Sequence, residues 1–209
     1  MEKETESARR SLAERRQQLL DAAIEVMSDR GISGTTTRAI TDEAGVPQGI
    51  FHYCFDSKSA LLRALLERES ERAMATPWEL DPADKTIADA LNAAIRAQLE
   101  RVRAEPKHFL VLAELHMIAR TDPSLAGLAQ TDRGRVIEQI ADVLARWLPD
   151  ASPEELHEWA TVVLAGMDGL TEGRLTSPDD RTIDAAARRF AHAIAAAIGK
   201  SRADHPATG

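Results

Sequence analysis

The segment from Thr35 to Lys58 concentrates side chains that can hydrogen-bond to nucleic acid. Gln48 offers an amide donor and an acceptor together, which matches the edge of adenine in the major groove of DNA. Gly49 beside it has no side chain, so the backbone there can approach a partner closely. Lys58 can hold a phosphate through its ammonium group, a contact that positions a protein on DNA without reading sequence. These residue types indicate a DNA-contacting segment.

Two short helices are needed to hold these side chains. The hydroxyl of Thr36 can cap the first helix, because apolar residues follow it at helical spacing. Gly45 stands where a left-handed backbone would end that helix and reverse the chain. Pro47 can open the second helix, and Ile50 and Phe55 are predicted to pack inward from it. Two helices joined by such a short turn are typical of a helix-turn-helix, whose second helix enters the major groove.

An ordinary helical hairpin would also tolerate a glycine turn, but the residues around this one resemble the tetracycline-repressor (TetR) family of bacterial regulators. The family pattern is matched without a gap at Thr35, Thr36, Ile40, Ala44, Gly45, Val46, Gly49, Tyr53, Phe55, Lys58 and Leu61. The chain departs from the usual pattern at Thr41, Pro47, His52 and Cys54.

Apolar residues recur at helical spacing along the chain, which predicts an all-α protein of about nine helices, and the resemblance implies the same fold. An N-terminal three-helix helix-turn-helix domain would bind double-stranded operator DNA, and a C-terminal helical domain would bind a small-molecule effector and form a homodimer. The predicted DNA-contacting residues are Thr35, Thr36, Thr37, Arg38, Pro47, Gln48, Gly49, His52, Tyr53 and Lys58.

Composition agrees with a helical protein but is neutral about DNA. Aromatic residues make up only 4% of the 209 residues, and we find no alternating strand pattern. The net charge is −8, and residues 1–75 alone hold 11 Lys and Arg against 13 Asp and Glu. DNA binding must therefore depend on a few placed groups rather than on bulk charge. The sequence shows no membrane-spanning run and no signal peptide, and its single cysteine fits a cytoplasmic protein.

The chain is predicted to divide near Thr76–Pro82, where two prolines interrupt the helical pattern. Residues 1–75 would form the DNA-binding domain, and residues 76–209 the ligand-binding and dimerisation domain. Within the first, a frayed arm over residues 1–10 is expected to precede a helix that ends at Gly31.

An effector pocket in the second domain would be apolar with a few polar contacts. The candidate lining residues are Phe109, Leu112, His116, Met117, Trp159, Val163, Met167 and Asp168. The alternative for each of them is an ordinary place in the hydrophobic core. No metal site or cofactor is predicted.

Small residues at spacings of three and four, Val162, Gly166, Gly169 and Gly173, give one helix a smooth strip. We interpret this strip as a dimer interface, because a protein that reads a palindrome needs a two-fold mate. The alternative is close helix packing within one monomer.

Two other functions remain open, a helical enzyme and a helical adaptor that does not bind DNA. The sequence contains no Gly-rich phosphate loop after a strand, no His-Glu-x-x-His and no paired cysteine ligands, so no constellation supports catalysis.

Overall fold

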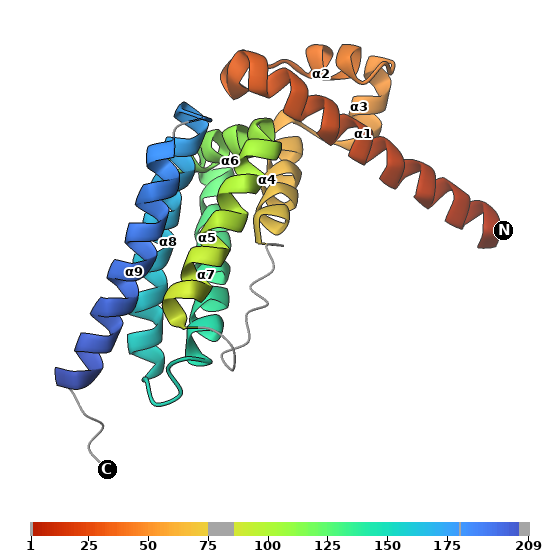
Figure 1. Ribbon diagram of the computed structural model, residues 1–209. Helices are drawn as coiled ribbons and strands as arrows, with labels where there is room; N and C mark the ends of the chain where they lie inside the picture. The colour runs from red at the N-terminus through yellow and green to blue at the C-terminus, as the bar shows by residue number, and fades with distance from the viewer. Residues whose placement is uncertain (1, 75–85, 180, 205–209) are drawn as a thin grey trace. The chain divides into compact units, whose positions relative to one another are not determined.

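Every regular element in the described part of the chain, residues 2–74, 86–179 and 181–204, is an α-helix in the computed structural model (Figure 1). The helices are α1 (Glu2–Gly34), α2 (Thr37–Glu43), α3 (Gln48–Cys54), α4 (Lys58–Met74), α5 (Ile87–Ala104), α6 (Pro106–Ala119), α7 (Pro123–Ala145), α8 (Pro153–Thr176) and α9 (Arg181–Asp204). The predicted all-α fold is confirmed. The predicted boundary at Thr76–Pro82 lies outside the described residues.

The chain forms two compact units. The first contains residues 1–72 and 107–130, so α6 and the start of α7 belong with α1 to α4. The second contains residues 73–106 and 131–209. Each unit is described by itself below.

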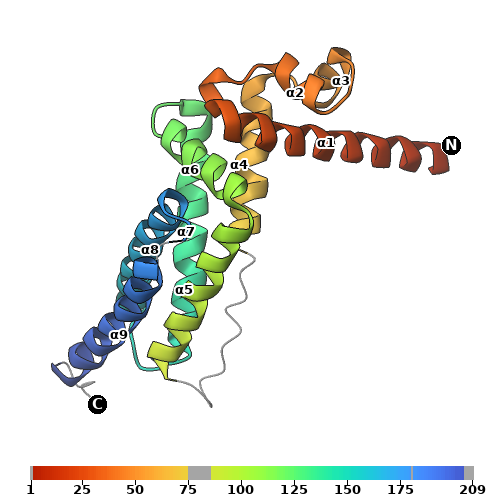
Figure 2. The same cartoon turned by 45° about the horizontal axis from the view of Figure 1, so that its top comes forward.

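In the first unit, α1, α2 and α3 pack on one another, as Figure 2 lets the reader follow. Its largest buried side chains are Leu19, Ile24, Met27, Ile40, Phe51, Leu61, Leu65, Leu66, Leu115 and Leu125. Burying each such side chain stabilises the fold by about 1.5–3 kcal/mol. Helix α1 begins at Glu2, so the predicted frayed arm is helical over residues 2–10. Gly31 has φ 70° and ψ 163°, and it breaks the helical conformation where the sequence predicted an end.

In the second unit, α5 packs against α8 and α9 around one hydrophobic core. Its buried members are Leu91, Ile95, Leu99, Ile137, Ile140, Leu144, Leu148, Ala160, Val163, Leu164, Ala187, Ala191, Ile194 and Ile198. Capping residues fix where α5 and α8 start. The Thr86 side chain accepts a hydrogen bond from the Asp89 amide, and the Ser152 side chain accepts one from the Glu155 amide. The C-terminal helix α9 extends to Asp204.

The glycine strip of α8 packs partly within the chain. A Cβ placed on Gly166 would lie 2.1 Å from the ring of Phe190, and one on Gly173 would lie 2.8 Å from Ile183, both on α9. At these two positions the alternative of close packing within one monomer is therefore correct. Gly169 faces open space, and the Val162 side chain is exposed.

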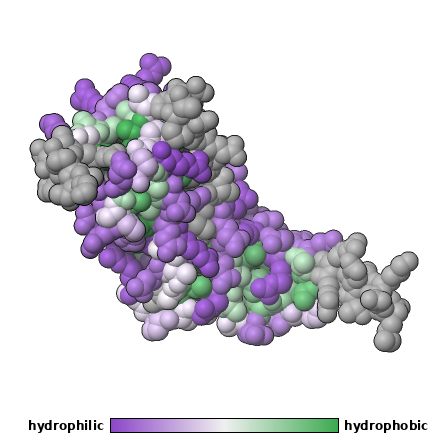
Figure 3. All heavy atoms as spheres, turned by 90° about the horizontal axis from the view of Figure 1, so that it is seen from below, coloured by the Kyte–Doolittle hydropathy of each residue, from purple (hydrophilic) through white to green (hydrophobic). Residues whose placement is uncertain are grey.

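The exposed surface is mixed in character. Figure 3 shows one face, on which hydrophobic side chains form separate small groups among hydrophilic ones. Among the residues that the structure describes, we find no helix with the length and apolar character needed to cross a membrane.

Candidate nucleic-acid interface

Helices α2 and α3 form the predicted helix-turn-helix. The hydroxyl of Thr36 accepts a hydrogen bond of 3.1 Å from the Ala39 amide, which confirms the predicted cap. Gly45 has φ 64°, the left-handed conformation that the sequence required for the turn. The Val46 amide then bonds to the Thr41 carbonyl at 3.0 Å, and Pro47 takes the N-cap position of α3. Pro47 thus precedes the first helical residue, whereas the sequence placed it within the helix.

Helix α3 has one buried and one exposed face. Phe51 and Cys54 are buried, and Phe51 is in contact with Phe55 (ring centroids 5.8 Å apart). The sequence predicted Ile50 rather than Phe51 for this inner position, but Ile50 is only half-buried. Ile50 and Phe51 are both apolar and adjacent, so spacing in a seven-residue helix cannot decide which of them faces the core.

The exposed face carries most of the predicted DNA contacts. Pro47, Gln48, Gly49, His52 and Tyr53 are exposed on and before α3, and Tyr53 retains 66% of its surface. On α2 and its cap, Thr36 and Arg38 are exposed and Thr37 is half-buried.

The two helices are also linked through these polar side chains. The Gln48 amide nitrogen donates to the Thr37 hydroxyl at 3.4 Å, and Arg38 forms a loose ion pair with Asp42 at 3.9 Å. The candidate base reader is therefore held beside a candidate phosphate contact.

Thr35 and Lys58 both hydrogen-bond to the backbone of the connection between α1 and α2. Thr35 is buried, and its hydroxyl donates to the Gly31 carbonyl at 2.8 Å. The Lys58 ammonium donates to the carbonyls of Ile32 at 2.7 Å and Thr35 at 2.6 Å. Burial lowers the pKa of Lys58, and the Glu114 carboxylate opposes part of that shift. Both side chains hold the connection between α1 and α2 from inside.

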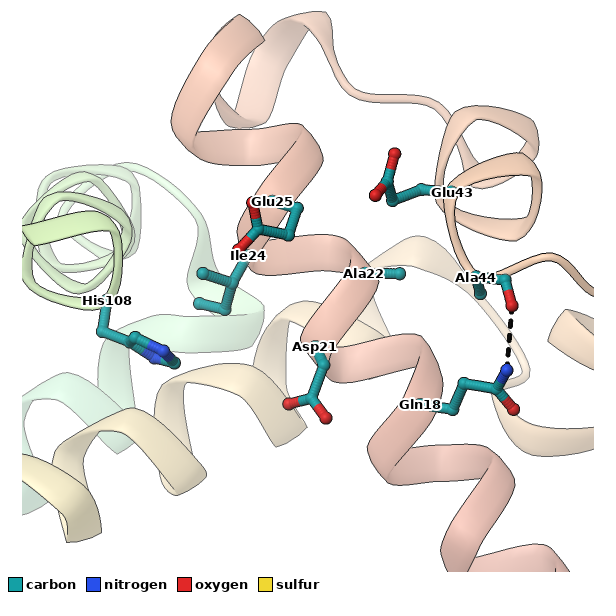
Figure 4. A pocket seen from close by; sticks show the side chains of 8 residues that line it. All are labelled: Gln18, Asp21, Ala22, Ile24, Glu25, Glu43, Ala44 and His108. Atoms are coloured by element: carbon teal, nitrogen blue, oxygen red, sulfur yellow. Dashed lines mark hydrogen bonds between the residues drawn. The ribbon is translucent and has the colours of Figure 1, made fainter. Parts of the chain in front are cut away.

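Two residues of α1 fix the carboxyl ends of the short helices, and sequence reasoning missed them. Arg16 donates to the Cys54 carbonyl at the end of α3, and its guanidinium lies 4.2 Å from the centroid of the Phe55 ring. Gln18 donates to the Ala44 carbonyl at the end of α2 at 2.8 Å, as Figure 4 shows. Cations suit helix C-termini, but no spacing signal links residues so far apart.

Cys54 shows no sign of an activated thiol. Burial raises its pKa, and only the positive charges of Arg16 and Arg15 oppose that shift. A reactive cysteine needs a lowered pKa and exposure, so the structure favours a packing role.

An open pocket of about 400 Å³ lies beside α1 in the first unit (Figure 4). It is lined by Gln18, Asp21, Ala22, Ile24, Glu25, Glu43, Ala44 and His108. Two of its carboxylates already have cationic partners, since Asp21 pairs with Arg68 at 2.7 Å and Glu25 pairs with Lys107.

The eight predicted effector-lining residues do not line that pocket, and they divide between the two units. In the first unit, Phe109 and Leu112 are buried, while His116 and Met117 are exposed.

The other four lie on α8 in the second unit. Val163 is fully buried in its core, and Trp159 and Met167 pack partly buried against that core. Asp168 is exposed and pairs with Arg133 at 3.1 Å. Core packing thus accounts for three of these four.

Comparison with known proteins agrees with this geometry. Residues 19–65 match the family described as bacterial regulatory proteins, tetR family. Residues 84–197 match the family described as tetracyclin repressor-like, C-terminal domain.

Individual relatives cover most of the chain. The HTH-type transcriptional activator FasR of Mycolicibacterium smegmatis is 26% identical over 173 residues, which are 82% of this chain and 76% of FasR. The HTH-type nicotine-responsive transcriptional repressor HdnoR of Paenarthrobacter nicotinovorans is 27% identical over 174 residues, which are 81% of this chain and 88% of HdnoR.

A crystal structure of a transcriptional regulator from Rhodococcus sp. Rha1 has the same fold, with a TM-score of 0.72 at 24% identity over 86% of this chain and 95% of that one. Because the C-terminal family match alone spans more than half of the 209 residues, the chain belongs to the TetR family of transcriptional regulators.

Proposed function

We propose that the protein is a homodimeric, ligand-responsive repressor that acts in the cytoplasm and binds palindromic operator DNA. The observation that supports this most directly is the two-faced character of α3, which buries Phe51 and Cys54 and exposes Gln48, His52 and Tyr53. The family consists of transcriptional regulators, so neither the enzyme nor the adaptor alternative is retained.

In this proposal α3 enters the major groove. Gln48 reads a base edge through its donor and acceptor, and Gly49 lets the backbone come close. Thr36, Thr37 and Tyr53 bind phosphates and set the register, together with Arg38 and His52. Thr35 and Lys58 hold this surface from behind rather than contact DNA.

The second copy would associate through the outward faces of α8 and α9. Val162 and Gly169 on α8 and Ala193 on α9 are exposed and small or apolar. These small or apolar residues would allow helices of two protomers to approach closely. Gly166 and Gly173 are not available for this contact, because they pack against α9 of the same chain. Two copies of α3 would then lie about 34–36 Å apart, one turn of the DNA helix.

The effector would bind within residues 76–209, and residues 1–75 would bind DNA. The two family matches, at residues 19–65 and 84–197, support this division. An effector that prefers the conformation unable to bind DNA shifts the population by its difference in affinity for the two states. HdnoR is by name a nicotine-responsive repressor, and the proposed mode of action follows this relative. FasR is by name an activator, so the sign of regulation needs a test. A reporter gene placed behind the selected operator should be expressed less when the protein is present, and higher expression would indicate an activator.

Selection of bound DNA from a random duplex pool tests the proposal. We expect an enriched palindrome with half-sites one helical turn apart. Gln48→Ala should relax the preference at one base pair per half-site, a change of about 1–3 kcal/mol in discrimination. Enrichment of no sequence would refute operator binding, and a single unpaired half-site would refute the dimer.

A further inference from the structure

The connection between α1 and α2 has an unusual backbone that needs partners from outside. Gly31 leaves the helical conformation, with φ 70°, so the amide that follows it loses its place in the helical ladder. The Ile32 amide instead donates to the Glu114 carboxylate of α6 at 2.8 Å. That carboxylate also lies against the kink, since a Cβ on Gly31 would come within 3.4 Å of it.

The carbonyls of the same connection bind the opposite charge. Lys58 donates to the Ile32 carbonyl at 2.7 Å and to the Thr35 carbonyl at 2.6 Å. Ile32 is therefore held at its N–H by Glu114 and at its carbonyl by Lys58. Both Ile32 and Thr35 are only 2% exposed, so water cannot easily replace these partners.

The position of this connection determines where α2 starts. Thr36 follows directly and caps α2 through the Ala39 amide. Thr37 is the first residue of α2 and accepts the hydrogen bond from Gln48. A displacement at Ile32 therefore shifts the exposed hydroxyls that are proposed to contact phosphate.

We infer that Glu114, although it lies on α6 outside the helix-turn-helix, is a positioning residue for DNA binding, acting with Lys58 through Ile32. This role rests on the operator binding proposed above. We expect that removing Glu114 weakens DNA binding. This is the opposite of the usual electrostatic effect, because removing a carboxylate ordinarily strengthens binding to a polyanion. A loss of affinity on removing Glu114 therefore separates positioning from bulk electrostatics.

The test compares two substitutions at Glu114 with a control, Glu67→Ala, that removes the same charge elsewhere. Glu114→Ala should weaken binding to the selected operator about tenfold, because the Ile32 amide loses its acceptor. Glu114→Gln keeps an acceptor and should restore affinity to within about threefold. Glu67→Ala removes an exposed carboxylate from α4 and should leave affinity unchanged or slightly tighter.

The Ile32 amide gives a second readout, by nuclear magnetic resonance of the full chain. Glu114→Ala should shift this resonance and speed its hydrogen exchange, and Glu114→Gln should reverse both effects. If circular dichroism shows that Glu114→Ala does not fold, Glu114→Asp, which withdraws the acceptor by one methylene, takes its place with a smaller expected loss.

The outcomes separate this role from the proposed function. Wild-type protein that binds no DNA would overturn both. Wild-type binding that Glu114→Ala leaves unchanged would overturn the positioning role alone, as would an unperturbed Ile32 amide or an equal loss of affinity in Glu67→Ala.

Discussion

Arg16 connects α1 to the end of the DNA-reading helix, and replacing it by alanine tests how that helix is held. The substitution removes the hydrogen bond to the Cys54 carbonyl and the cation–π contact with Phe55, whose centroid lies 4.2 Å away. A hydrogen bond from a charged donor contributes about 1.5–3 kcal/mol, and the half-exposed cation–π contact about 0.5–1 kcal/mol. Freeing the long side chain returns up to about 2 kcal/mol of rotamer entropy. The expected net loss in free energy of unfolding is about 1–2 kcal/mol.

The neighbouring Arg15 supplies a control with the same change of charge. Its side chain is exposed and, among the described residues, donates only to Gln18, at 2.8 Å, so Arg15→Ala should change the free energy of unfolding by less than about 0.5 kcal/mol. Urea unfolding should be followed by far-ultraviolet circular dichroism. Circular dichroism is preferred to tryptophan fluorescence, because the tryptophans that the structure describes, Trp147 and Trp159, lie outside the unit that contains Arg16.

DNA binding provides the second assay for Arg16. If the residue positions α3 without touching phosphate, Arg16→Ala weakens operator binding while the dependence on salt keeps its slope. A slope reduced by about one unit would mean that Arg16 contacts a phosphate directly. Equal destabilisation by Arg15→Ala and Arg16→Ala would refute the capping argument.

Three further outcomes follow from the geometry. A Cβ on Gly49 would meet no atom within 4 Å in the free protein, so Gly49→Ala should stabilise α3 by up to about 0.5 kcal/mol. The same methyl group should weaken operator binding by keeping the backbone away from DNA, and tighter binding would exclude a close backbone approach. Gly166→Ala should cost about 1–3 kcal/mol in thermal or urea unfolding because its Cβ would strike the ring of Phe190 at 2.1 Å, whereas Gly134→Ala, whose Cβ would meet no atom within 4 Å, should not destabilise the protein. Hydrogen bonds at the start of α7 lower the pKa of Asp122 from 3.8, so this carboxylate stabilises the fold at neutral pH and the effect is lost as pH falls through its lowered pKa. The melting temperature of Asp122→Ala should therefore lie below wild type at pH 7 and approach it below pH 3.8, and a constant difference would contradict the role of the charge.

The sequence by itself determined the features that depend on a few neighbouring residues. The Thr36 cap and the left-handed Gly45 were both predicted and are present. Each is a hydrogen bond or backbone conformation settled within about three or four residues, so residue type and spacing are sufficient to specify it. The helical periodicity predicted an all-α fold for the same reason.

Only the tertiary structure decided which side chains support the DNA-reading surface. Arg16 reaches a carbonyl 38 residues away, and Glu114 reaches an amide 82 residues away. Lys58 is the clearest case: its position at the start of α4 predicts a phosphate contact, and only the structure shows that its ammonium donates to two backbone carbonyls. Such pairings depend on how helices pack across the core, and a long polar side chain satisfies whichever buried group that packing leaves without a partner.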